Sequence, residues 1–160
     1  MITSSEILQR ERQARLLSSG IAPDSLEGVW ILQNTWSKHG KRPTPGTDPL
    51  LRSLGARLQL EQRDEKWTIV NQVNLGSLRL RFQGAAQLKG SRPLLTFGFC
   101  SVDISLAGRT LLHRSIPQPS PQRIPFFALI AMAPDGQWLT ARGRGGGLAL
   151  WQSCLLYTSD

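Results

Sequence analysis

The sequence predicts an all-β protein built from an antiparallel sandwich or up-and-down barrel. Short apolar runs of strand type recur between turn signals from Gly28 onward. No helical segment alternates with these runs, which excludes a parallel α/β sheet. One run alternates apolar and polar residues with the two-residue period of a strand that has one buried face.

The first expected element is a helix over residues 4–19. This segment is rich in Gln, Arg, Glu, Leu and Ala and contains neither Gly nor Pro. Its apolar residues make an imperfect stripe. Gly20 is suited to end the helix, because glycine tolerates the left-handed conformation that follows a helix.

About eight or nine strands are expected after the helix, separated by Pro-rich loops and tight polar turns. They cover residues 28–36, 54–62, 67–75, 78–88, 94–104, 110–113, 126–133, 137–142 and 147–151. Within the run 78–88, apolar residues alternate with Arg79 and Arg81, which predicts one buried face and one solvated basic face. A closed barrel of eight strands has room for side chains or one small ligand.

Length and charge limit the possible classes. The chain has 160 residues, enough for one domain with a core, and its formal net charge of +8 admits nucleic acid, an anionic membrane or acidic ligands as partners. The longest apolar stretch, residues 126–133, is far shorter than the roughly 20 residues of a membrane-spanning helix. We expect no secretory signal and, because Glu6 and Glu11 lie near the start, no transit peptide.

Metal, cofactor and catalytic chemistry have no support in the pattern. The two cysteines and two histidines stand at unrelated positions, which predicts neither a disulfide framework nor a metal site, and no cofactor is expected. Neither His39 nor His113 has a Ser or Cys nucleophile at a recognisable spacing. The sequence therefore predicts a protein that is not an enzyme. It leaves the oligomeric state open.

Gly28 and Trp30 open the first strand with a Gly-x-Trp pattern that resembles the start of lipocalin-type barrels. The resemblance implies that the Trp closes one barrel end and that an Arg from the last strands lies over its ring. Arg142 is the candidate, and such a contact contributes roughly 0.5–2 kcal/mol. The alternative interpretation is a strand with a core Trp.

A Gly-rich segment with two arginines covers residues 142–148. Its backbone N–H groups could cradle a phosphate. Phosphate loops of the well-attested kind open a helix, however, and a strand follows here, so a hairpin turn is favoured.

Two surfaces are candidates for membrane contact. Arg79 and Arg81 lie on the polar strand face, while Phe82 falls on the opposite face. A solvated basic face is therefore favoured, contact with an anionic lipid surface is the next choice, and an oligonucleotide-binding barrel comes after both. Phe126 and Phe127 begin the longest apolar run, which fits either a buried barrel wall or an exposed apolar rim. Burial is favoured for that run.

Three stretches in order resemble the plastid lipid-associated protein family, also called fibrillins, of plastids and cyanobacteria. Residues 26–35 resemble the family's Leu-Asp-Gly-x-Trp-x-Leu-x-Tyr-Thr signature, and residues 69–73 resemble its Val-x-Asn-x-Val stretch. Residues 135–148 resemble its terminal Asp … Arg-Gly-x-x-Gly-x-Leu element. The chain departs from the family at Asn34, at Ala133-Pro134 and at Ala149, where Tyr, Tyr-Leu and Phe are usual.

The resemblance implies a lipocalin-like antiparallel β-barrel that binds or shelters hydrophobic photosynthetic lipids or pigments, such as a prenyl-quinone, carotenoid or tocopherol, without enzymatic chemistry. It implies peripheral contact with an anionic membrane, at thylakoids or plastoglobules of a plastid or in the cytoplasm or thylakoids of a cyanobacterium. The candidate ligand-binding or barrel-closing residues are Gly28, Trp30, Thr35, Asn71, Asp135, Arg142, Gly143 and Gly146. Two alternatives stay open: a single-stranded nucleic-acid-binding barrel, with nucleic acid the last of the three partners, and a pigment-attaching lyase of the same barrel class.

The expected organisation has three parts. Residues 1–23 form the helix and a linker, and residues 24–152 form the lipocalin-like fibrillin domain. Residues 153–160 resemble a translated adapter tail, and we expect them not to be native.

Overall fold

The computed structural model describes residues 2–40, 57–90, 93–118 and 120–154. It contains helix α1 (Ser4–Leu17) and the short 3₁₀ turns η1 (Pro23–Leu26) and η2 (Pro121–Arg123). Its strands are β1 (Gly28–Trp36), β2 (Arg57–Arg63), β3 (Lys66–Leu75), β4 (Leu78–Lys89), β5 (Leu94–Leu106), β6 (Arg109–Ser115), β7 (Phe126–Met132), β8 (Trp138–Gly143) and β9 (Leu148–Ser153). The predicted antiparallel all-β fold with one N-terminal helix is confirmed. The start of the predicted strand 54–62 and residues 155–160 of the predicted tail lie outside the described residues.

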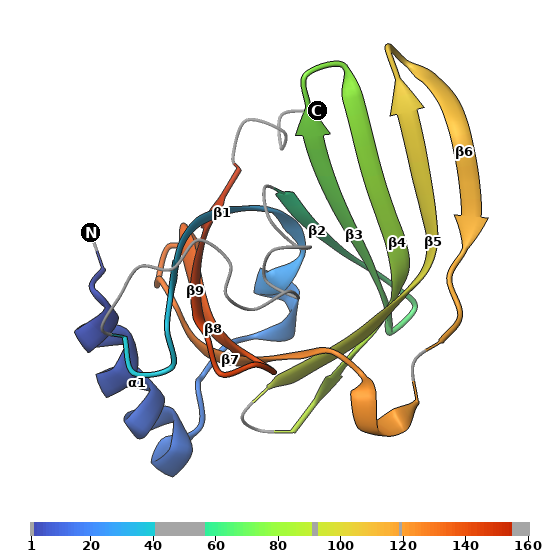
Figure 1. Ribbon diagram of the computed structural model, residues 1–160. Helices are drawn as coiled ribbons and strands as arrows, with labels where there is room; N and C mark the ends of the chain where they lie inside the picture. The colour runs from blue at the N-terminus through green and yellow to red at the C-terminus, as the bar shows by residue number, and fades with distance from the viewer. Residues whose placement is uncertain (1, 41–56, 91–92, 119, 155–160) are drawn as a thin grey trace.

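Eight of the nine described strands close into a ring, and only β6 lies outside it (Figure 1). The ring runs β1-β2-β3-β4-β5-β7-β8-β9, every pair is antiparallel, and β9 returns to β1. Because the ring is closed, each of its eight described strands has a hydrogen-bonded neighbour on both sides.

Strand β5 divides its outer edge between two partners. Its first residues, 94–96, pair with β7 and keep the ring closed, whereas residues 101–106 pair with β6. As a result β3, β4, β5 and β6 extend together beyond the ring (Figure 1). We call residues 71–75, 78–83, 101–106 and 109–115 the projecting sheet.

The interior of the ring is filled by large apolar side chains. Trp30, Trp151 and Phe127 are the largest of its fully buried side chains, each at most 2% exposed, and the Trp30 indole Nε1–H donates to the Leu26 carbonyl at 2.9 Å. The cluster consists of Leu26, Trp30, Leu58, Leu60, Trp67, Ile69, Ala86, Leu95, Phe97, Phe127, Leu129, Leu139, Ala141, Ala149 and Trp151.

Helix α1 packs on the outside of the ring. Its Ile7 forms a second apolar cluster with Ile130 and Ala131 of β7 and Leu148 of β9. Both faces of β7 are therefore covered, one by the ring interior and the other by the helix. This is why its apolar residues are consecutive in the sequence rather than alternating with polar ones. No helix within the described ranges is long and apolar enough to cross a membrane.

The helix differs from its prediction in its end and in its buried stripe. A capping box of Thr3 and Glu6 begins it, and it ends at Leu17, two residues early, with Ser18 at φ 70° as the C-cap. The buried residues are Ile7, Glu11 and Ala14, one helical face at spacings of four and three. Leu16 and Leu17, counted in the predicted stripe, are 84% and 81% exposed.

Candidate functional site

One face of the projecting sheet carries apolar side chains on all four strands, with Arg109 and Arg114 of the edge strand β6 opposite Leu106 and Val102. The register places Val73 opposite Leu80, Leu80 opposite Ile104, and Ile104 opposite Leu112, and residues directly opposite in antiparallel strands share a face. We call this surface the apolar face. Its members are Val73, Leu75, Leu78, Leu80, Phe82, Val102, Ile104, Leu106 and Leu112.

The apolar face is only partly covered. Leu75 is 60% exposed, Leu106 43% and Leu112 39%, and its other members are half-buried. The opposite face of the same sheet is polar: Arg79 and Arg81 are exposed there, and the His113 ring Nδ1 contacts the Asp103 carboxylate. A contiguous exposed apolar surface with a polar surround is the usual mark of a binding site for a protein, a membrane or an apolar ligand.

Aromatic rings join the apolar face to the core of the ring. The Phe82 centroid lies 5.6 Å from that of Phe99, which lies 5.7 Å from Phe97. Phe97 stacks on Phe127 at 5.3 Å, and Phe127 meets Trp151 edge-on at 5.0 Å. These separations are those of favourable aromatic pairs. The apolar face thus continues the ring interior, and it is exposed where β5 pairs with β6 instead of β7.

Asn71 lies at the base of this face. It is fully buried and stands opposite Leu58 on one side and Phe82 on the other. Its Nδ2 donates to the Arg57 carbonyl at 3.0 Å, which fixes the amide orientation. Its Oδ1 accepts no hydrogen bond from the described residues, and neither does the buried Trp151 Nε1–H find an acceptor there. A buried polar atom left unpaired costs about 1–3 kcal/mol, so a donor group that reached Asn71 Oδ1 would be stabilised.

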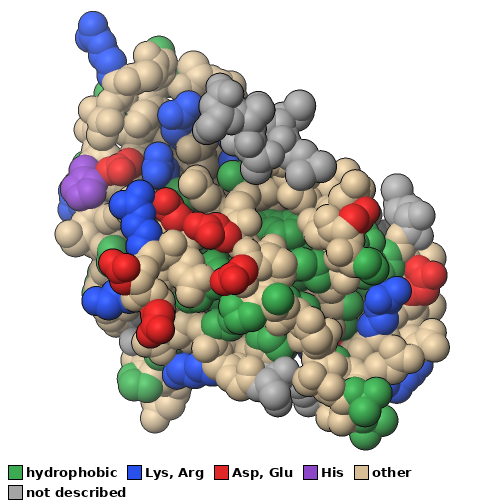
Figure 2. Space-filling model, turned by 180° about the vertical axis from the view of Figure 1, so that it is seen from behind, with side chains coloured by type: hydrophobic (Ala, Val, Ile, Leu, Met, Phe, Trp, Pro, Cys, Tyr) green, Lys and Arg blue, Asp and Glu red, His purple; other side chains and the backbone are tan. Residues whose placement is uncertain are grey.

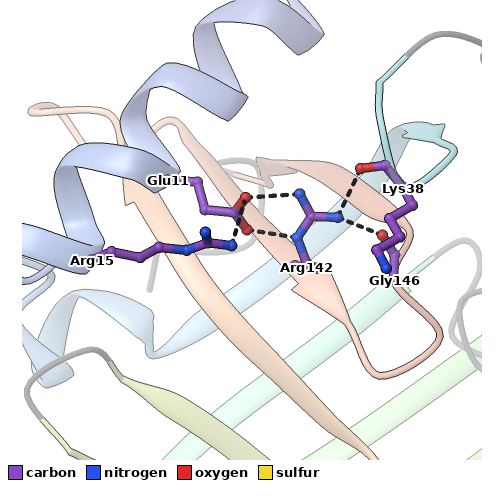
Figure 3. Close-up of polar contacts among 5 residues, drawn as sticks. All are labelled: Glu11, Arg15, Lys38, Arg142 and Gly146. Atoms are coloured by element: carbon purple, nitrogen blue, oxygen red, sulfur yellow. Dashed lines mark hydrogen bonds and ion pairs between the residues drawn. The ribbon is translucent and has the colours of Figure 1, made fainter.

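Arg142 lies in a polar cluster on the outside of the ring (Figure 3). Its Nε and Nη2 donate to the two Glu11 carboxylate oxygens at 2.6 and 2.8 Å, and its Nη1 donates to the Lys38 and Gly146 carbonyls at 3.0 and 2.6 Å. Arg15 Nη2 approaches Glu11 at 3.7 Å. This bidentate pair ties α1 to the turn between β8 and β9.

The predicted contact of Arg142 over the Trp30 ring is wrong. Arg142 stands opposite Leu148, whose side chain packs against α1 outside the ring, whereas Trp30 points into the ring. Strand alternation therefore puts the two side chains on opposite sides of the wall. The cation over an aromatic ring in the described residues is Arg10, 5.3 Å from the Trp138 centroid.

The other predicted site residues do not converge on one pocket. Gly28 begins β1 at φ 140°, and Thr35 stands opposite Ala149 near the end of that strand. Asp135 accepts from the Gln137 N–H at 3.1 Å within its turn. The Gly143 N–H donates to the Gly147 carbonyl at 2.9 Å, which makes the Gly-rich segment the expected hairpin turn, and Gly146 has the φ of 94° that such a turn requires of glycine.

The candidate residues for membrane contact differ in their exposure. Phe127 is 1% exposed in the core, so the structure contradicts its contact with a membrane, and Phe126 is half-buried on the outside of the ring. Arg79 and Arg81 remain exposed. Seen from behind, the surface carries acidic side chains among the basic ones, so the excess positive charge does not form an unbroken basic patch there (Figure 2).

Two functional features, the apolar face and Glu11, were not predicted from the sequence. The apolar face needed the register of four strands, although the alternation in residues 78–82 was a signal for one of them. Glu11 had a signal too, because it falls on the helical stripe of Ile7 and Ala14. Comparison of the chain with protein-family models finds no match, and comparison with curated proteins finds none either.

Proposed function

We propose that the protein binds or shelters a hydrophobic lipid or pigment of the prenyl-quinone, carotenoid or tocopherol class, without enzymatic chemistry. The observation that carries the proposal is the apolar face with Asn71 at its base. The ring interior holds large side chains, so the ligand lies along the projecting sheet rather than deep within the ring. The resemblance to plastid lipid-associated proteins supports the same ligand classes.

The chemistry of the ligand follows from the surface. A long apolar body would cover half-buried leucines such as Leu80, and each fully covered apolar side chain contributes about 1.5–3 kcal/mol. A hydroxyl at one end would donate to Asn71 Oδ1, the unpaired buried acceptor. A tocopherol or a prenyl-quinol has both features, whereas an alkane-like lipid has only the first.

Titration with α-tocopherol tests this proposal. We expect Leu80→Gln to weaken binding about tenfold, because an uncovered amide replaces apolar contact. Arg79→Gln is the matched control, since it places the same side chain on the polar face of the same strand. Equal affinity of the two variants would refute the apolar face as the site.

A second titration isolates Asn71. The methyl ether of α-tocopherol lacks the O–H donor, so the wild-type protein should bind it about fivefold more weakly, which corresponds to one hydrogen bond. In Asn71→Leu the two compounds should bind alike. Because the result is a ratio within one variant, a general loss of affinity does not obscure it. A ratio unchanged by Asn71→Leu contradicts the assignment.

The tips of the projecting sheet are the surface we propose for peripheral membrane contact. The β3–β4 and β5–β6 turns lie side by side, joined by the Ala107 N–H to the Ser77 carbonyl at 3.0 Å. The exposed leucines Leu75 and Leu106 flank these turns, with Arg79 and Arg109 beside them. Apolar side chains beside arginines fit the interface of an anionic bilayer.

Sedimentation with vesicles of phosphatidylcholine and phosphatidylglycerol tests the contact. The wild-type protein should sediment at low salt and progressively less as salt screens the arginines. Leu75→Ser with Leu106→Ser should remove most of the bound fraction. Leu16→Ser with Leu17→Ser, which replaces two exposed leucines of the helix, should leave it unchanged. Equal loss in both pairs would count against the tips.

A further inference from the structure

We infer a second ligand site, on the outside of the ring, that takes an anionic amphiphile: a carboxylate with a hydrocarbon chain. The site is a cleft of about 480 Å³ beneath the connection from β6 to β7, and we call it the outer cleft. It lies on the opposite side of the sheet from the apolar face, and it does not depend on the proposed function.

The cleft exists because β5 changes partners. The chain leaves β5 with β6 and must return to pair as β7, so residues 116–118 and 120–125 arch over the outer face. Backbone hydrogen bonds anchor both ends of the arch to β5, from the Ile116 N–H to the Cys100 carbonyl at 2.8 Å and from the Phe97 N–H to the Pro125 carbonyl at 3.1 Å. Arg144, from the β8–β9 turn, donates to the Ile124 carbonyl at 3.0 Å and to the Gln122 carbonyl. The arch is therefore held at both ends and, near its second end, at Gln122 and Ile124.

Small side chains leave space beneath the arch. Ala85 and Gly98 stand opposite each other on the outer face of β4 and β5 and form the floor with Thr96. Pro121, Ile124 and Phe126 supply an apolar wall. A volume of about 300–1,000 Å³ is typical of small-molecule sites, so the cleft has the size for one hydrocarbon chain.

The charged residues that line the cleft favour an anionic ligand. Lys89 and Arg144 both line it, and no Asp or Glu is among the described residues that do. Lys89 is exposed, so its ammonium group can move to meet an anion. The guanidinium of Arg144 gives two of its five N–H donors to the arch, which leaves others for a ligand. An apolar body with one carboxylate matches this combination of wall and charge.

Binding of cis-parinaric acid, a fluorescent long-chain carboxylate, tests the outer cleft. Ala85→Trp fills the floor from an exposed position and should weaken binding at least about tenfold by steric exclusion. Gln59→Trp, on the exposed outer face of β2, is the matched control and should bind as the wild type does. Parinarate binding that survives Ala85→Trp overturns the inference.

Competition establishes the charge requirement. Decanoate should displace parinarate roughly two- to fivefold better than decanol does, the size of one partly exposed ion pair. Lys89→Ala should remove that preference, whereas Lys66→Ala, at the β2–β3 turn, should keep it. Equal displacement by decanoate and decanol in the wild type refutes an anion site.

The two sites can be told apart with the same proteins. Leu80→Gln should lose α-tocopherol and keep parinarate, and Ala85→Trp should do the reverse. Loss of parinarate in Leu80→Gln, with retention in Ala85→Trp, would assign the carboxylate to the apolar face and overturn the outer cleft. Failure of tocopherol binding alone would refute the proposed function and leave the outer cleft standing.

Discussion

Replacing Arg142 with Met is expected to lower the free energy of unfolding by about 3 kcal/mol, because the change strands the Glu11 carboxylate without its main cation. The two side chains are only 18% and 11% exposed, and their contact is bidentate. Breaking a buried ion pair from one side costs about 3–5 kcal/mol. The lower end applies here since Arg15 stays within 3.7 Å of Glu11.

Urea unfolding measures this loss of stability, and three further variants show whether it comes from the ion pair. Glu11→Met should destabilise by a similar amount, because it leaves the Arg142 guanidinium without the carboxylate. The double variant should recover most of the loss, since a buried ion pair replaced by apolar side chains of like volume is often neutral. Arg12→Met, at an exposed position of the same helix, should change stability by less than about 0.5 kcal/mol. An Arg142→Met protein as stable as Arg12→Met would show that the pair does not hold the helix.

The strands could be predicted because local chemistry determines them. Apolar runs end at Gly, Pro and Asp turns, so β1 begins and ends where the sequence indicated, and most other strands differ only at their ends. The helix end was less certain because its stop is not a glycine: Ser18 takes the positive φ, and Gly20 lies beyond the helix. Local sequence signals thus predicted which elements form better than they predicted where each element begins and ends.

The candidate site could not be predicted because it depends on contacts distant in sequence. Alternation in β4 indicated that Leu78 and Leu80 would be buried, yet they lie half-buried beyond the ring. Their exposure follows from the departure of β5 to pair with β6, which no local pattern encodes. Arg142 is a parallel case, since its partner is 131 residues away in the sequence and is identified only when α1 docks.

Gly84 is the residue at which the ring and the projecting sheet separate. The β4–β5 register shifts between Gln83 and Gly84, where Cys100 is the extra residue. A bulge of this kind bends a strand and increases its twist. The position needs glycine for space rather than for its backbone angle: a Cβ there would lie 1.8 Å from the Gly98 carbonyl oxygen and 2.8 Å from the Phe99 Cα.

Gly84→Ala is therefore expected to destabilise the protein by about 4 kcal/mol, above the usual cost of overpacking, because the obstructing atoms are backbone and cannot rotate aside. Urea unfolding measures this, with soluble yield as the readout if the variant shows no folded baseline. Gly108→Ala, where nothing lies within 4 Å but φ is 82°, should cost only about 1–2 kcal/mol of backbone strain. Ala85→Gly, the neighbouring reverse change, should cost about 0.5–1 kcal/mol. A loss in Gly84→Ala no larger than in Gly108→Ala would mean that β4 and β5 do not cross so closely, and the projecting sheet would then lack the bend that carries its apolar face out of the ring.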